Sequence, residues 1–169
     1  KLLDFPTITD ISDNYFQLST FVQNRAEEIR MSHLPVPIDQ ILVVCLRGTD
    51  KGAEVRQSPI DAYVRRAKKI MADNENLRVW IQTDQAQIRD TLLDQLGPRS
   101  FSLDILPVTE ASRVIHKSEV EISRHDFSRD LLATTWLMSQ AHAVITYTGN
   151  VGYWIAIFRG NAKKLYQLR

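Results

Sequence analysis

The sequence has few of the residues that build metal sites and disulfide frameworks, and its positive and negative charges nearly balance. Its 169 residues include one cysteine, Cys45, and four histidines with no metal-like spacing. The formal net charge is +1, so no general basic field is present to attract nucleic acid. No apolar run approaches the length of a transmembrane helix. These absences argue against a metalloprotein, a nucleic-acid-binding protein and a protein with a transmembrane segment.

Three common active-site motifs are also absent. The chain has no G-x-G-x-x-G after a strand, no G-x-x-x-x-G-K-[ST] and no G-x-S-x-G. These gaps disfavour a dinucleotide oxidoreductase, a P-loop ATPase and a hydrolase with a nucleophile elbow. Neither an N-x-[ST] site nor a signal peptide is visible, which favours a cytoplasmic location but leaves the secretory pathway open as an alternative. The first residue is Lys1 rather than Met, so we expect a piece of a longer protein or a processed product.

What is present is an alternation of strand and helix patterns. Residues 41–46 are apolar without interruption, which predicts a strand buried on both faces of a parallel sheet. The alternation predicts an α/β fold with a doubly wound, mostly parallel, Rossmann-like sheet and helices on both faces. Further strands are expected over residues 77–82, 101–106, 143–147 and 164–168. Helices are expected over residues 60–70, 88–93, 128–140 and 151–159.

Two stretches lie outside this alternation. Residues 1–40 are expected to form an N-terminal segment with one amphipathic helix over residues 14–31, after an irregular stretch over residues 1–13. Residues 41–169 would form the Rossmann-like domain. Residues 107–125 show no clean period, so we expect either a functional loop or a partly disordered stretch there.

Polar residues follow three of the predicted strands at the point where each strand ends. Residues 47–51 (Arg-Gly-Thr-Asp-Lys) follow the first strand, Thr83 and Asp84 follow the second, and residues 147–150 follow the fourth. Open α/β sheets bind ligands at the carboxyl ends of their strands, which share one edge. We therefore expect these three groups to converge on one site.

The residue types in these groups suit an anionic ligand, and we predict a diphosphate. Arg47 offers a planar fork that fits phosphate, and Lys51 offers a point charge. The helix predicted after Thr148 and Gly149 would add free N–H groups and its dipole. Gly149 would allow close approach of the backbone to the ligand.

Each group also has a simpler interpretation. An Arg–Asp ion pair could serve only to tie down the loop after the first strand. Asp84 and Asn150 could be ordinary helix N-caps. Cys45 lies within the first strand, so we expect it to be a buried core residue.

The stretch Arg-Gly-Thr-Asp-Lys at residues 47–51, followed by Glu54 and by Ser-Pro-Ile-Asp-Ala-Tyr at residues 58–63, resembles a known donor-site motif. This motif is found in the fucosyltransferases that add fucose in α-1,6 linkage, including the rhizobial chitin-oligosaccharide enzymes. Thr83-Asp84 is similar to the family's Thr-Asp-Asp, and residues 137–142 are similar to its Leu-Ser-Gln-Ala-Asp. Residues 147–151 fall where the family has Thr-x-Ser-Ser. The resemblance spans residues 41–160.

The resemblance implies the donor half of an inverting, metal-independent GT-B glycosyltransferase. The implied donor is GDP-fucose, and the acceptor would be a glycan or another hydroxyl compound. In the implied roles, Arg47 binds the β-phosphate and Glu54 deprotonates the acceptor. Residues 1–40 are too few for a second Rossmann domain, so the acceptor-binding domain would be missing. The implied donor-binding residues are Arg47, Asp50, Lys51, Thr83, Asp84, Thr148, Gly149 and Asn150, and the catalytic residues are Arg47 and Glu54.

Several positions depart from the family pattern. Cys45 stands where the family has His, and Gly48 replaces a second Arg. Thr134 stands where the family has Asp, with Asp130 one helical turn earlier. These departures favour an alternative, a non-catalytic Rossmann-like nucleotide-binding or scaffolding domain that has lost transferase activity. A third possibility is a different α/β enzyme that acts on a phosphorylated metabolite.

Overall fold

Parallel strands form the centre of the molecule in the computed structural model, which describes residues 4–48, 58–110 and 123–168. The strands are β1 (Ile41–Cys45), β2 (Arg78–Gln82), β3 (Ser100–Ser102), β4 (Ala143–Tyr147) and β5 (Leu165–Leu168). They lie in the order β3-β2-β1-β4-β5, and every neighbouring pair is parallel. The predicted α/β fold with a Rossmann-like parallel sheet is confirmed.

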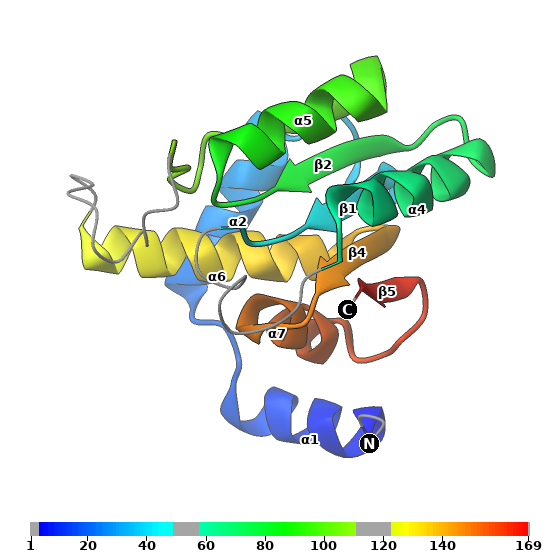
Figure 1. The fold of residues 1–169 in the computed structure, drawn as a ribbon. Helices are drawn as coiled ribbons and strands as arrows, with labels where there is room; N and C mark the ends of the chain where they lie inside the picture. Colours follow the sequence, from blue (N-terminus) through cyan, green and yellow to red (C-terminus); the bar gives the residue numbers. More distant parts are fainter. Residues whose placement is uncertain (1–3, 49–57, 111–122, 169) are drawn as a thin grey trace.

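Helices cover both faces of this sheet (Figure 1). The α-helices of the described residues are α1 (Phe5–Tyr15), α2 (Thr20–His33), α4 (Ile60–Ala72), α5 (Ala86–Leu96), α6 (Arg124–Gln140) and α7 (Asn150–Arg159). On one face, α4 and α5 pack together and belong to the connections from β1 to β2 and from β2 to β3. On the other face, α6 contacts both α2 and α7, and α1 packs against α7. None of these helices is long and apolar enough to cross a membrane.

The core lies on both sides of the two central strands. All residues of β1 and β4 are buried, as the uninterrupted apolar run at residues 41–46 predicts for a strand covered on two faces. The covering helices contribute apolar residues at helical spacing, such as Tyr63 and Ala67 of α4. Because the central strands are held so tightly, the loops at their carboxyl ends start from fixed positions.

The N-terminal segment differs from its prediction. The single helix expected over residues 14–31 is two helices, α1 and α2, and the stretch expected to be irregular holds most of α1. Pro6 lies in the first turn of α1, where a missing N–H costs nothing, so it does not break the helix. The break comes at Ser19, whose hydroxyl accepts a hydrogen bond from Val22 N at 3.4 Å and caps α2.

Other element ends shift by a few residues. Ser123, not Ser128, caps α6, and its hydroxyl accepts from Asp126 N at 3.1 Å. Pro59 is the N-cap residue of α4, although the preceding residue, Ser58, is of a type that caps helices more often. The third strand spans only Ser100–Ser102, shorter than the expected 101–106. Helices α5 and α7 end at Gly97 and Gly160, which both have positive φ, a conformation that glycine adopts without strain.

Candidate functional site

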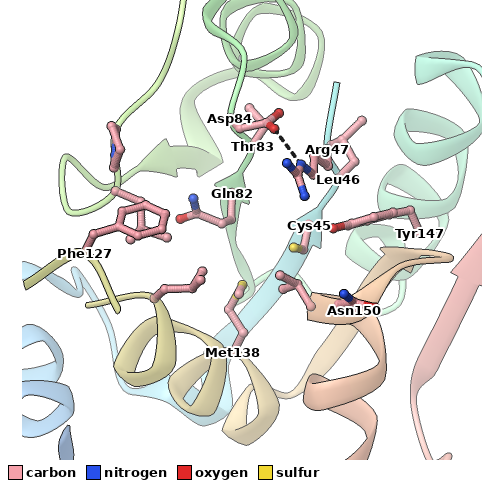
Figure 2. Close-up of a pocket in the computed structure, with 14 residues that line it drawn as sticks. Cys45, Leu46, Arg47, Gln82, Thr83, Asp84, Phe127, Met138, Tyr147 and Asn150 are labelled. Carbon is pink, nitrogen blue, oxygen red and sulfur yellow. Dashed lines mark hydrogen bonds and ion pairs between the residues drawn. The ribbon is translucent and has the colours of Figure 1, made fainter. Parts of the chain in front are cut away.

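A pocket of about 240 Å³ opens at the carboxyl edge of the sheet (Figure 2). Its polar rim carries Arg47 from the end of β1, Asp84 from the end of β2 and Asn150 from the start of α7. Strands β1 and β2 are in register with Cys45 opposite Gln82, so Arg47 and Asp84, two residues further along, come level with each other. Members of all three groups therefore border one pocket, although Thr148 and Gly149 do not line it and residues 49–51 lie outside the described part of the chain.

Arg47 and Asp84 form an ion pair at this rim. Arg47 Nε donates to Asp84 Oδ2 at 3.1 Å, and the side chains are 27% and 13% exposed, respectively. The other carboxylate oxygen of Asp84 accepts from Gly48 N at 2.8 Å. Asp84 thus holds the start of the loop after β1. It is not the N-cap of α5, because Gln85 occupies that position, and the cap interpretation is wrong.

The N-terminus of α7 forms another part of the rim. Gly149 is the N-cap residue and makes no side-chain cap, so Asn150 as N-cap is also wrong. Asn150 and Val151, the first residues of the helix, line the pocket. First-turn N–H groups have no partner within their own helix, and the helix dipole adds positive potential there. This end of α7 can therefore receive an anion.

Two glycines allow α7 to start so close to β4. A Cβ on Gly149 would lie 2.3 Å from Cε2 of the Tyr147 ring, so any larger residue would displace that ring. A Cβ on Gly152 would lie 2.5 Å from the backbone oxygen of Tyr147. Sequence analysis gave no role to Gly152, although the spacing Gly149-x-x-Gly152 at a strand-to-helix turn is typical of a helix that packs closely against the preceding strand.

The interior of the pocket is apolar. Phe127, Leu131 and Met138 from α6 form one wall. Leu131 and Met138 lie within the helix expected over residues 128–140, and Phe127 lies just outside it. Their helical spacing made one shared face predictable, but the boundary error at α6 hid Phe127. Cys45, the last residue of β1, also lines the pocket, and burial raises the pKa of its thiol to about 12. The thiol is therefore neutral near pH 7, which agrees with the predicted core role.

The remaining predicted site residues separate into two groups. Thr83 lines the pocket, whereas Thr148 does not, and its hydroxyl accepts from Gln167 Nε2 of β5 at 3.2 Å. Asp50, Lys51 and Glu54 lie outside the described residues, and their roles stay predictions.

Asp130, one helical turn before Thr134, does not line the pocket, so it does not take the place of the acidic residue that Thr134 replaces in the family pattern. Its carboxylate accepts from Arg25 Nε at 2.9 Å and from Arg129 Nε at 2.8 Å, away from the pocket lining. Thr134 itself is fully buried. The described residues contain no cluster of His, Cys, Asp and Glu that could hold a metal ion.

The fold and the position of its pocket define a Rossmann-like α/β domain of the kind that forms one half of a GT-B protein. No protein-family model and no curated protein matches the chain. Among solved structures, the chain is similar to NodZ alpha-1,6-fucosyltransferase co-crystallized with GDP, with a TM-score of 0.50 and 16% identity over 85% of this chain and 42% of that one. The same enzyme soaked with GDP-fucose gives a TM-score of 0.48 and 14% identity over 84% and 43%. This likeness shows the fold alone, and the chain spans less than half of that enzyme.

Proposed function

We propose that residues 41–169 form the donor-binding domain of a glycosyltransferase that uses a nucleotide sugar, with GDP-fucose as the donor to test first. The observation that carries this proposal is the shared rim, where the Arg47 guanidinium and the N-terminus of α7 border one pocket. Both groups favour a phosphate, and they belong to adjacent strand ends. Similarity in fold to an enzyme co-crystallized with GDP supports the same ligand class.

The rim can supply the electrostatics of sugar transfer without a metal. Breaking the bond between a sugar and its diphosphate builds negative charge on the leaving oxygen, which a fixed guanidinium and helix N–H groups stabilise. Inversion requires in-line attack by an acceptor hydroxyl, helped by a carboxylate base. We propose Glu54 as that base, with Asp50 and Lys51 bordering the diphosphate. The acceptor, a glycan or another hydroxyl compound, would be held largely by a second domain.

The first experiment is thermal unfolding with and without GDP and GDP-fucose at millimolar concentration. A ligand that binds only the folded state raises its stability, by about 2.7 kcal/mol at one hundred times its dissociation constant. We expect both nucleotides to raise the melting temperature. If no nucleoside diphosphate shifts it, the proposal is wrong, and stabilisation by simple phosphates alone would indicate an enzyme of phosphorylated metabolites instead.

A non-catalytic nucleotide-binding domain is the second candidate. The ion pair between Arg47 and Asp84 favours it, because a neighbouring carboxylate offsets the positive charge available to a leaving group. Cys45, an uncharged residue at the pocket base, points the same way. GDP binding without sugar transfer, measured together with any natural flanking domain, would support this candidate over the transferase.

A further inference from the structure

The side-chain amide of Gln82 lines the pocket and makes no hydrogen bond with the described residues. It projects from the end of β2 into the pocket, on the side of Phe127 and Met138 (Figure 2). A carboxamide carries two N–H donors and a carbonyl acceptor. Gln82 is half-buried, so water reaches the amide until a ligand covers it, and covering it costs free energy unless the ligand supplies a hydrogen-bond partner. The amide therefore points to a polar edge on whatever fills the pocket.

Gln82 lies deeper than the charged rim. It pairs in register with Cys45, and the ion pair of Arg47 and Asp84 lies two residues further along both strands. Because a strand rises about 3.3 Å per residue, the amide starts about 7 Å below that ion pair. The pocket thus has two layers, an apolar layer with one amide and an outer layer of charge.

A flat heteroaromatic ring fits the inner layer better than a sugar does. The ring has apolar faces for the walls around Leu131 and Met138, and a polar edge for one amide. A sugar carries hydroxyls on all sides, and most of them would lose their hydrogen bonds to water here. The volume of about 240 Å³ admits one ring system and leaves the phosphates at the rim.

We propose that Gln82 sets the nucleobase specificity of this site through one donor–acceptor pair, an inference that rests on the proposed nucleotide-sugar function. Guanine presents an N–H beside a carbonyl oxygen, and uracil presents the same pair. A carboxamide can bond both atoms of either base. No carboxylate of the described residues shares the inner layer, so nothing there demands the two adjacent N–H donors that are particular to guanine. The native site accepts GDP and UDP with affinities within about tenfold of each other, since one hydrogen bond is worth about 1 kcal/mol.

The test is calorimetric titration of the full chain with GDP, UDP and pyrophosphate. Gln82→Met keeps the length of the side chain and removes its polar edge. We expect this variant to bind both nucleotides about tenfold more weakly, the loss expected for one or two hydrogen bonds. Pyrophosphate binding should stay within twofold, because the rim is unchanged, and it also reports that the variant is folded. Gln95→Met, the same change at an exposed position of α5, is the matched control and should match the native chain.

A charge-bearing variant tests specificity directly. Gln82→Glu offers two acceptors and no donor, which suits the two N–H groups of guanine and opposes the carbonyls of uracil. We expect the ratio of GDP to UDP affinity to rise at least tenfold. Leu131→Trp, which fills the inner layer, should abolish the difference between nucleotides and pyrophosphate.

The outcomes separate the two proposals. Nucleotide binding that is unchanged in Gln82→Met, or a GDP to UDP ratio that is unchanged in Gln82→Glu, overturns the role of Gln82 and leaves the donor domain standing. A native chain that binds pyrophosphate but gains nothing from any base overturns the base site as well. A native chain that binds none of these ligands overturns the proposed function itself.

Discussion

At the scale of single residues, Arg47 has two tasks under the proposed function, to pair with Asp84 and to bind a phosphate, and both use the same positive charge. Its ion pair with Asp84 fixes the side chain at the rim, and the same carboxylate offsets part of its field. A guanidinium presents donors in a planar fork, so one contact with Asp84 and a second with a phosphate are geometrically compatible. Pre-orientation by Asp84 then reduces the entropy lost when a diphosphate binds.

Replacing Arg47 separates the two tasks. We expect Arg47→Ala to lower kcat/KM for sugar transfer by about 2–4 kcal/mol of transition-state stabilisation, as when one preorganised donor is removed. Stability should fall far less, because Gly48 N still bonds Asp84. Transfer kinetics and urea unfolding measure the two effects. Arg89→Ala, which removes a surface pair with Asp90, is the control and should alter neither. An unfolded Arg47→Ala chain would show that the residue only ties down the loop.

Gly152 gives a second prediction at this scale, with an unusual sign. Within a helix, changing Gly to Ala normally stabilises a protein by about 0.4–1 kcal/mol. Here the added Cβ would lie 2.5 Å from the backbone oxygen of Tyr147, so the start of α7 must move. We expect Gly152→Ala to destabilise the chain by about 1–3 kcal/mol and to weaken GDP binding. Urea unfolding checks the first effect, and a stabilised variant would contradict the close approach.

At the scale of elements, sequence patterns predict types better than ends. The uninterrupted apolar run at residues 41–46 predicts a strand, because such a run suits burial on both faces of a sheet. The helical period of α4 predicts a helix, because its apolar residues fall on one stripe. The ends depend on a few hydrogen bonds. Ser19 and Ser123 cap their helices, and neither differs in type from nearby Ser12 or Ser128. Phe127 was missed for this reason, because it precedes the expected start of α6, whereas the pocket residues at strand ends followed from topology alone.

The contact between α2 and α6 illustrates an interaction that no local pattern indicates. Asp130 joins Arg25 of α2 to its own neighbour Arg129, although Arg25 is far away in sequence. Burial alone would raise the pKa of Asp130, but hydrogen bonds from Arg129 and Arg25 outweigh it, and the pKa lies below its ordinary value of 3.8. As the pH falls, the Asp130 carboxylate therefore becomes protonated at a higher pH in the unfolded chain than in the folded chain.

This shift predicts a pH dependence for Asp130→Asn. A lowered pKa in the folded state stabilises the protein above about pH 4, and the stabilisation disappears as the pH falls through the folded pKa. We expect the variant to lose about 3 kcal/mol at pH 7, as for other broken buried ion pairs. The difference from the native chain should shrink in acid. Urea unfolding at pH 7 and pH 3 measures it, and a constant difference would refute the ionic explanation.

At the scale of the whole molecule, the N-terminal segment and the Rossmann-like sheet share one core. Val22, Ala26 and Ile29 of α2 are buried in the same cluster as the strands. By contrast, α1 contacts mainly α7 and leaves Tyr15 79% exposed. The two N-terminal helices therefore contribute very differently to stability, a distinction that the single predicted helix concealed.

Two truncations test that difference. Removing residues 1–17 should leave cooperative unfolding and ligand binding intact. Removing residues 1–36 strips three buried apolar side chains from the core, with the two larger ones worth about 1.5–3 kcal/mol each, and we expect the remaining chain to lose cooperative unfolding. Thermal melts followed by circular dichroism check both. Should residues 37–169 melt cooperatively, α2 is dispensable and the sheet is self-sufficient.

The pairing of β1 with β4 joins residues about a hundred positions apart, and this affects when the binding site can form during synthesis. During synthesis, the ribosome releases β1 and Arg47 long before Asn150 exists, and pairings between distant segments form slowly. A nascent chain therefore carries half a binding site until α7 has left the exit tunnel. Binding competence arises in one step, once α7 is present, so a nucleotide could protect from proteolysis only those chains that already include α7.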